Sequence, residues 1–347
     1  MFLEQIGADA RVRDCMQPYQ AAGLELGRVS FAAHEQYRLF LEAGECEASP
    51  AGRLRFDDVL PAVGDWVAVR AVDPDLALIE ALLPRTTQFS RRAPGTDVAE
   101  QVIAANVDVT LIVCALDHDF NLRRLERYLV LAAESAAAAV LVLNKADLCP
   151  DSGDKAEAAR LLAPELTIVT LSALEDVEPL RDLVRNRTVV LLGSSGAGKS
   201  TIANGLLGEG RQATQAVRES DSRGRHTTTS RMLLPIPGGG AIVDNPGMRE
   251  LQLWASQESL DDVFKEIAMV AERCRFKDCT HASEPDCAIQ TALADGNLDT
   301  ARWASYQKLT AELRHRAVEQ DIHAQIAEKK RWKAIHKEMR NHPKYRR

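Results

Sequence analysis

The chain has 347 residues, of which 46% are hydrophobic, 27% charged and 5% aromatic, and its formal net charge is −7. This length predicts two or three domains, and the composition is that of a folded globular protein, which excludes wholesale disorder. No apolar run reaches the roughly 18–20 residues that a membrane-spanning helix needs, and the first 15 residues lack the apolar core of a signal peptide. We therefore expect a cytoplasmic protein with no membrane partner.

The first 95 residues predict a small all-β domain at residues 21–95, after an N-terminal extension at residues 1–20. Short runs with partial alternation, separated by turn-forming residues, predict four strands: Gly27–Phe31, Gln36–Leu41, Asp65–Arg70 and Ala77–Leu83. Several short strands in fewer than a hundred residues indicate a small barrel, and an OB-fold is one such barrel among others.

An α/β pattern occupies residues 97–254. Apolar runs of strand length alternate with helical stretches, the clearest of which is Leu122–Ala138. This alternation predicts a parallel sheet that helices cover on both faces. The apolar runs are Val107–Cys114, Ala139–Leu143, Thr167–Leu171, Thr188–Leu192 and Ala241–Val243.

A polar segment, Asn144-Lys-Ala-Asp147, follows the second of these runs. The Asp147 carboxylate can accept both the N1–H and the N2 amine of guanine, whereas adenine presents an acceptor at N1 and no such amine. Asn144 can serve the opposite edge of the base, the Lys145 stem can pack over the ring, and Ala146 completes the segment. We predict that these four residues bind a guanine base.

Ser172 and Ala173 also follow a predicted strand. A backbone N–H at this pair can bind the O6 atom of guanine. The dipeptide has no meaning on its own, so this prediction depends on the sheet placing it beside residues 144–147.

The segment Gly-Ser-Ser-Gly-Ala-Gly-Lys-Ser at residues 193–200 fits the phosphate-binding template G-x4-G-K-[ST], and it follows a strand and opens a helical stretch. Its glycines let backbone N–H groups face a polyphosphate at a helix N-terminus. Lys199 would reach the β- and γ-phosphates, and the Ser200 hydroxyl would ligate Mg²⁺. An ordinary glycine-rich turn is the alternative. The predicted contacts are Gly193, Ser194, Ser195, Gly196, Ala197, Gly198, Lys199, Ser200 and Thr201.

Asp244-Asn-Pro-Gly247 follows the last apolar run. The Asp244 carboxylate, at the end of a strand, can hold Mg²⁺ through water, and the Gly247 N–H can meet a γ-phosphate. The polar residues 220–229 include threonines that can complete the Mg²⁺ coordination, for which we select Thr228. A plain surface loop is the alternative for residues 220–229.

Together these parts describe a guanine-nucleotide site in an unusual order. In ordinary GTPases the phosphate-binding loop precedes the Asn-Lys-x-Asp segment, whereas here residues 144–147 and Ser172 precede Gly193. Loops that neighbour one another at the carboxyl edge of a parallel sheet can share a ligand whatever their order in the chain. The sequence therefore predicts a circularly permuted α/β P-loop GTPase domain.

Residues 255–347 predict a helical domain around a cysteine-rich segment. Cys274, Cys279, His281 and Cys287 supply three thiolates and one imidazole within fourteen residues. Four such ligands suit tetrahedral Zn²⁺ and leave no open position, so we predict one structural zinc ion. Free buried thiols or a redox pair are the alternatives.

The tail, residues 329–347, holds nine Lys or Arg against one acid, a net charge of +8, while the other 328 residues carry 34 bases and 49 acids. Trp332 and Tyr345 lie among these bases. Basic residues neutralise phosphates and aromatic rings stack on exposed bases, so the tail is a candidate RNA-binding segment. A solvated helix face is the alternative.

The chain resembles the bacterial ribosome small-subunit-dependent, circularly permuted GTPase family over nearly its whole length, including Gly-Arg-His-Thr-Thr-Thr at residues 224–229. It departs at Asn245, where the family usually has Thr or Ser, and we expect little effect. The resemblance implies hydrolysis of GTP to GDP and phosphate, stimulated by the small (30S) ribosomal subunit late in its maturation, with contacts to its 16S rRNA. We expect a monomer whose nucleotide state controls ribosome binding and release.

Met248 stands where many GTPases place a water-orienting glutamine, and a thioether cannot orient water. We select His226 for that task, as the resemblance also suggests, together with Lys199 and Thr228 as the catalytic group. A loop histidine that contacts solvent or the ribosome is the alternative.

Two other classes of protein stay open at this stage. One is an adenine-nucleotide P-loop enzyme in which residues 144–147 are coincidental. The other is a nucleic-acid-binding module whose nucleotide pocket is regulatory or vestigial.

Overall fold

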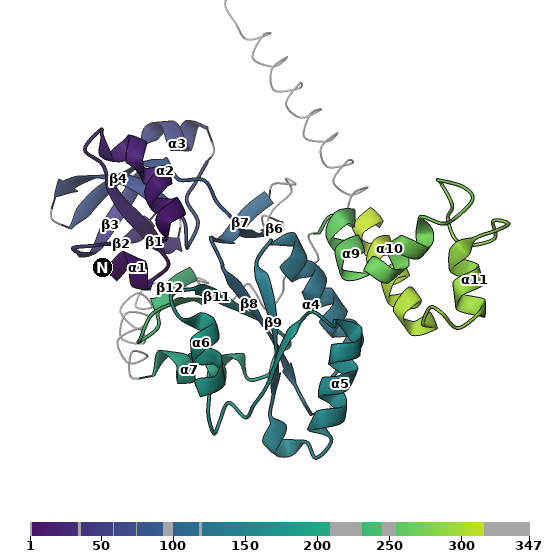
Figure 1. Cartoon of the computed structure of the whole chain (residues 1–347). Helices are drawn as coiled ribbons and strands as arrows, with labels where there is room; N and C mark the ends of the chain where they lie inside the picture. The colour runs from purple at the N-terminus through teal and green to yellow at the C-terminus, as the bar shows by residue number, and fades with distance from the viewer. Residues whose placement is uncertain are drawn as a thin grey trace, which may run out of the picture. The chain divides into compact units, whose positions relative to one another are not determined.

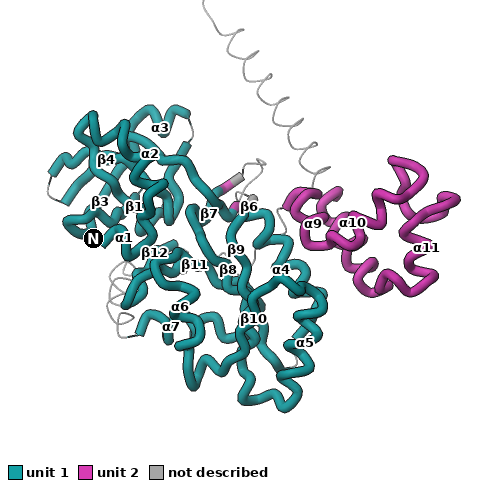
Figure 2. The backbone as a smooth tube through the Cα atoms, viewed as in Figure 1, with its two compact units in different colours: residues 1–89, 102–251 teal, residues 90–101, 252–347 magenta. Residues whose placement is uncertain are grey.

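The computed structural model describes residues 2–33, 36–57, 59–73, 75–92, 100–117, 120–208, 231–244 and 255–315. The chain divides into two compact units, one of residues 1–89 and 102–251 and the other of residues 90–101 and 252–347 (Figure 2). Within the described ranges, no helix is long and apolar enough to cross a membrane.

Two helices occupy the N-terminal extension: α1 (Phe2–Gln5) and α2 (Ala10–Gln20) (Figure 1). Asp9 caps the second helix, because its carboxylate accepts a hydrogen bond of 2.9 Å from the Val12 backbone N–H. Val12 and Met16 are buried. The extension is therefore a folded part of the larger unit.

Residues 25–82 form a closed five-stranded barrel. The strand order is β1-β2-β3-β5-β4, and β4 pairs back onto β1 to close it; β3 and β5 are parallel, and the other neighbours are antiparallel. This closure confirms the predicted OB-like barrel. Its elements are β1 (Glu25–Ala33), β2 (Gln36–Leu41), β3 (Gly44–Pro50), α3 (Gly52–Phe56), β4 (Trp66–Asp73) and β5 (Leu76–Leu82).

The sequence analysis missed β3, which completes the barrel. Its sequence, Gly-Glu-Cys-Glu-Ala-Ser-Pro, has no aromatic or β-branched residue, so local propensity does not favour a strand. Alternate residues Cys46, Ala48 and Pro50 are buried, and the strand pairs with β2 on one side and β5 on the other. Pairing with neighbours outweighs the weak local preference.

A mostly parallel sheet forms the rest of the larger unit. Across the sheet the order is β10-β9-β8-β11-β13-β12, in which the first five strands are parallel and β12 is antiparallel. Each of the five apolar runs predicted as strands here is a strand. The strands are β8 (Val109–Ala115), β9 (Ala138–Asn144), β10 (Thr167–Thr170), β11 (Thr188–Leu192), β12 (Arg231–Pro235) and β13 (Ala241–Asp244).

Helices connect the parallel strands along the chain, as the α/β pattern predicts. Alternate residues of β8, including Leu111 and Val113, share one buried apolar cluster with Leu180 of α6 and Ile202 of α7. These helices fix the position of the loops that follow the strands. The connecting elements are α4 (Leu122–Glu134), the 3₁₀ turn η1 (Ala146–Leu148), α5 (Ser152–Leu162), α6 (Glu178–Val184) and α7 (Lys199–Leu207).

The predicted helix Leu122–Ala138 is too long at its C-terminal end. α4 ends at Glu134, Ala136 has a φ of 60°, and Ala138 pairs with Val109 of β8 as the first residue of β9. Alanines favour a helix in isolation, which explains the error. The parallel pairing with β8 takes these residues into the sheet instead.

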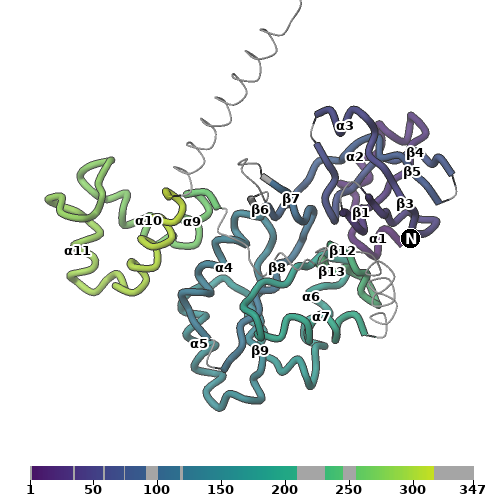
Figure 3. The backbone as a smooth tube through the Cα atoms, turned by 180° about the vertical axis from the view of Figure 1, so that it is seen from behind, coloured from purple at the N-terminus to yellow at the C-terminus, as the bar shows by residue number. Residues whose placement is uncertain are grey.

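The barrel and the mostly parallel sheet are joined through strand β1, which pairs with strands of both. Residues 25–28 of β1 pair with β4 of the barrel, and after an irregularity between Val29 and Phe31, Phe31 and Ala32 pair with β12. A bulge bends a strand and so lets its two ends serve different partners. The result is one sheet of eleven strands, and β12 lies beside the barrel in both views (Figures 1 and 3).

A buried arginine holds this junction together. Arg28 of β1 is 1% exposed, and its guanidinium donates to the backbone carbonyls of Ile6, Gly64 and Asn106. It also donates to the Thr188 hydroxyl at 2.6 Å, at the start of β11. Burial lowers the pKa of Arg28 to about 10, so the group keeps its charge at neutral pH.

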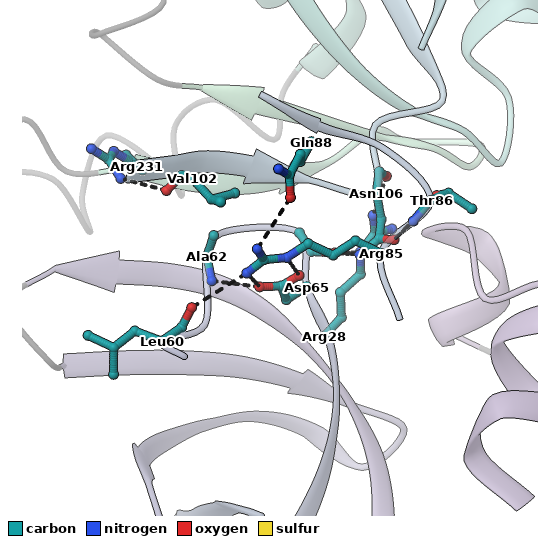
Figure 4. Close-up of polar contacts among 11 residues, drawn as sticks. Arg28, Leu60, Ala62, Asp65, Arg85, Thr86, Gln88, Val102, Asn106 and Arg231 are labelled. Atoms are coloured by element: carbon teal, nitrogen blue, oxygen red, sulfur yellow. Dashed lines mark hydrogen bonds and ion pairs between the residues drawn. The ribbon is translucent and has the colours of Figure 1, made fainter. Parts of the chain in front are cut away.

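An ion pair lies in the same region, on the barrel side. Arg85 donates two hydrogen bonds of 2.7 Å to the buried carboxylate of Asp65, as Figure 4 shows. Asp65 also accepts from the Ala62 N–H at 2.7 Å, while Asn106 links Thr86 to the Gly64 carbonyl. A two-pronged arginine–carboxylate pair fixes geometry as well as charge.

The smaller unit is helical in its described C-terminal part, with α9 (Gln257–Val263), α10 (Lys265–Ala271), α11 (Ala288–Ala294) and a helix at residues 300–315. Its core includes Phe264, Ile267 and Ile289, each fully buried. The remaining described part contributes to a two-stranded sheet, β6 (Gln88–Arg92) with β7 (Glu100–Ala105), which the sequence analysis missed.

Replacing Arg28 with methionine should lower the free energy of unfolding by about 3 kcal/mol, because buried carbonyls lose their donor. Urea denaturation measures this change. The control is Arg70→Met, since the Arg70 side chain is 55% exposed in its pair with Glu80, and a surface pair contributes about 0–1 kcal/mol. Equal effects of the two substitutions on the free energy of unfolding would show that the buried hydrogen bonds of Arg28 do not stabilise the junction.

Candidate functional site

The glycine-rich loop leads from β11 into α7 and is shaped by close backbone contacts. Gly193 has a φ of 144°, and a Cβ atom there would lie 2.2 Å from the Val113 carbonyl oxygen of β8. Only glycine fits this approach. The Lys199 Nζ donates to the Gly193 carbonyl at 2.7 Å and to the Ser194 carbonyl, so the lysine lies back over its own loop.

The N-terminus of α7 faces this loop without a side-chain cap. Gly198 is the N-cap residue, with a φ of 98°, and glycine has no side chain that could accept a hydrogen bond from the first turn. Ser200 lies in that turn and is exposed. Uncapped N–H groups and the helix dipole together form an anion-binding position.

Asn144 joins three of the predicted segments. Its side chain is buried at the end of β9, and Nδ2 donates to the Ala197 carbonyl of the glycine-rich loop at 2.9 Å. Its Oδ1 accepts from the Ala173 N–H, also at 2.9 Å. One amide therefore holds the loops after β9, β10 and β11 together, although they are distant in sequence.

The other residues of the Asn-Lys-x-Asp segment are half-buried or exposed. Lys145 has a left-handed φ of 66°, and its Nζ lies 2.7 Å from the Asp117 carboxylate. The Ala146 N–H donates to the Leu171 carbonyl, and Asp147 is exposed in the 3₁₀ turn. The Asp147 carboxylate is thus accessible to a base.

Ser172 and Asp244 lie at the ends of strands on either side of these segments. Ser172 is 8% exposed, and its hydroxyl has no hydrogen-bond partner among the described residues. Asp244 ends β13, which is parallel to β11 and adjacent to it, so both strands end at the same edge of the sheet. Gly247, His226, Thr228 and the tail lie outside the described residues.

A cluster of potential metal ligands lies in the smaller unit. The ligand atoms of Cys274, Cys279, His281 and Cys287 all lie within 4.8 Å of one another. The Cys274 and Cys287 sulfurs are 3.5 and 3.6 Å from the His281 Nδ1. Tetrahedral Zn²⁺ with bonds of about 2.1–2.3 Å places its ligands about 3.6 Å apart, so this set fits zinc.

Hydrogen bonds pre-form the loop that carries these ligands. The Glu284 carboxylate accepts from the N–H groups of Thr280, Ala282 and Ser283, and bonds from Thr280 lower its pKa to about 2. Gln290 Nε2 donates to the His281 carbonyl at 2.6 Å. Burial lowers the pKa of the His281 imidazole, which favours the neutral form that binds a metal.

The predicted site residues do not include Asp117, which contacts Lys145, or Glu284, which holds the loop between two of the predicted metal ligands. Asp117 follows β8 and belongs to no motif, and Glu284 lies between two ligands at a position that ligand spacing does not mark. A polar residue close to the end of a central strand of a parallel sheet is the signal that could have identified Asp117.

Comparisons with known proteins agree with this geometry. The family model described as RsgA GTPase matches residues 82–254. The chain is 45% identical to a protein named Small ribosomal subunit biogenesis GTPase RsgA from Opitutus terrae, over 98% of this chain and 97% of the relative. It is 43% identical to a protein of the same name from Leptospira interrogans, over 86% of this chain and 84% of the relative.

Two solved structures share the fold. The crystal structure of YjeQ from Thermotoga maritima is 26% identical, with a TM-score of 0.65, over 84% of this chain and 98% of that chain. The structure of YloQ, described as a circularly permuted GTPase, is 22% identical, with a TM-score of 0.63, over 84% and 96%. These matches confirm the predicted permuted α/β domain, which here accompanies the barrel and the Cys/His cluster.

Replacing Gly198 with alanine should weaken guanine-nucleotide binding about tenfold or more, because a Cβ there would lie 2.0 Å from Asn144 Nδ2. Equilibrium titration with fluorescent GDP measures the change. Gly153→Ala is the matched control, since Gly153 lies in α5 and a Cβ added there would meet nothing within 4 Å. Equal affinities for the two variants would show that the contact has no role in binding.

Proposed function

The chain belongs to the RsgA GTPase family and is a GTP-hydrolysing enzyme, and we propose that the small ribosomal subunit stimulates this hydrolysis late in the maturation of that subunit. The main structural support for a nucleotide site is the Asn144 side chain, which joins the loop at residues 193–198 to Ala173. This arrangement places the predicted base-binding and phosphate-binding residues at one edge of the sheet.

The base specificity follows from the hydrogen-bonding groups at this edge. Asp147 is exposed and would accept from N1–H and the N2 amine of guanine, which adenine cannot match. The Ala173 N–H already donates to Asn144, so the backbone of residues 172–173 lies beside the base-binding segment. We assign guanine recognition to Asn144, Lys145, Ala146, Asp147, Ser172 and Ala173.

The phosphates would bind at the N-terminus of α7. In the structure Lys199 contacts carbonyls of its own loop, and it would exchange these for the β- and γ-phosphates. The Ser200 hydroxyl would ligate Mg²⁺, with Thr228 as a further ligand, and the Asp244 carboxylate would hold the ion through water. When bound, Mg²⁺ offsets the negative charge that develops on the phosphates during hydrolysis.

Catalysis would consist mainly of positioning and electrostatics. A water would attack the γ-phosphorus, and the bond between that phosphorus and the oxygen bridging to the β-phosphate would break. GDP and phosphate would then leave. Because Met248 cannot orient that water, we assign this role to His226. Lys199 neutralises charge on the transferred group.

The partner assignment rests on the named relatives. Proteins 45% and 43% identical to this chain carry the name Small ribosomal subunit biogenesis GTPase. We assign the 30S subunit and its 16S rRNA as partners of a cytoplasmic monomer, with residues 21–95 as the barrel, 97–254 as the GTPase domain, and 255–347 as a zinc domain with an RNA-binding tail. The nucleotide would control binding and release.

Phosphate release from GTP and from ATP, each with and without purified small subunits, tests the proposal. We expect turnover with GTP alone and strong stimulation by the subunits. Equal turnover of ATP would favour an adenine-nucleotide enzyme, and nucleotide binding without turnover would favour a binding module.

His226→Ala should lower subunit-stimulated hydrolysis about 100-fold while GTP affinity stays within about twofold, because the residue acts on water and not on the nucleotide. Single-turnover phosphate release measures the rate, and fluorescent-nucleotide titration measures the affinity. Unchanged stimulated turnover would remove His226 from the mechanism.

Metal analysis should find one zinc ion per chain, held by the Cys₃His cluster. Cys287→Ala should lose the zinc and lower the melting temperature of the smaller unit, because the ligands contribute folding free energy. The control is Cys149→Ala, since Cys149 is buried outside the cluster. If the chain contained no zinc and a chelator left its melting temperature unchanged, the assignment would be contradicted.

A further inference from the structure

The Lys145 side chain is held by a residue that belongs to none of the nucleotide-binding motifs. Its Nζ lies 2.7 Å from the Asp117 Oδ2, and the two side chains are 29% and 28% exposed. Asp117 is the second residue after β8, the neighbour of β9 in the sheet. The contact therefore joins the loop after one strand to the loop after the next.

The residue before Asp117, Leu116, is itself held by two hydrogen bonds. Lys155, in the first half of α5, donates from its Nζ to the Leu116 carbonyl at 2.9 Å, and it lies 5.6 Å from the centre of the Phe120 ring. The Leu116 N–H donates to the Asn144 carbonyl at 2.8 Å. Asp117 thus sits on a backbone that is anchored on both sides.

The lysine backbone is fixed as well. Lys145 has a φ of 66°, in the left-handed region that few residues other than glycine adopt. Without a partner, the four-carbon stem of Lys145 would populate many rotamers, and ordering them at the moment of binding would weaken the affinity for the nucleotide. A partner that orders the stem beforehand removes part of that cost.

We propose that Asp117 is a positioning residue for guanine recognition. Its carboxylate holds the Lys145 ammonium, so that the lysine stem lies in place to cover one face of the base. The inference rests on the proposed function, because it needs a guanine at residues 144–147. It predicts that Asp117 acts on affinity through Lys145 and makes no contact with the base.

The first test compares affinities for fluorescent GDP. Asp117→Ala and the isosteric Asp117→Asn should each weaken binding about fivefold, as expected for a partly exposed ion pair, and Asp117→Glu should restore part of it. Turnover at saturating GTP should stay within about twofold. The control is Asp182→Ala, which removes an exposed pair with Arg185 from α6; it should leave the affinity unchanged.

A double-mutant cycle separates positioning from a general structural effect. In a Lys145→Ala background, Asp117→Ala should cause no further loss, because the group it acts on is gone. Losses that add in full would overturn the proposal, as would an affinity for Asp117→Asn equal to that of the unsubstituted chain.

Xanthine nucleotides test whether Asp117 itself touches the base. Asp147→Asn should gain affinity for XDP, since an amide complements the xanthine edge, and Asp117→Asn should not. A gain for Asp117→Asn would overturn the positioning role. An unsubstituted chain that binds GDP no better than ADP would overturn the proposed function and this inference with it.

Discussion

The larger unit depends on the burial of one positive charge, the Arg28 guanidinium. A charge withdrawn from water needs hydrogen-bond acceptors in fixed positions, and here they come from the N-terminal segment, a barrel loop, Asn106 and Thr188. Thr188 begins the strand that leads into the glycine-rich loop. The barrel and the glycine-rich loop are therefore parts of one folded unit, joined by a hydrogen bond between Arg28 and Thr188.

The site itself depends on a second buried polar group, the Asn144 amide. Its two hydrogen bonds connect loops that are 29 and 53 residues away. Gly198 permits that approach because any Cβ would collide with Nδ2. This explains why circular permutation is harmless: the contacts run between neighbouring loops at one sheet edge, and none of them depends on which strand comes first in the chain.

The smaller unit solves a different problem. Its described helices α9, α10 and α11 have seven residues each, too few to be stable alone. Phe264 and Ile267 supply a small core, and the Cys₃His cluster lies beside Trp303, whose ring is 5.8 Å from that of His281. In small domains a metal ion held by such a cluster can compensate for a small apolar core. The pre-formed loop around Glu284 lowers the cost of bringing the ligands together.

The sequence by itself predicted the five parallel strands, the permuted order of the segments and the grouping of the three cysteines with His281, because apolar runs, glycines and ligand spacings are local properties. Only the tertiary structure decided where α4 ends, that β3 and β12 exist, that β1 pairs with both β4 and β12, and that Asp117 contacts Lys145. Each of these depends on a partner far away in the chain: Ala138 became a strand residue because it pairs with Val109, and β3 formed because β2 and β5 flank it. Local propensity differs by only about 1 kcal/mol between residue types, so a paired neighbour or a buried charge outweighs it.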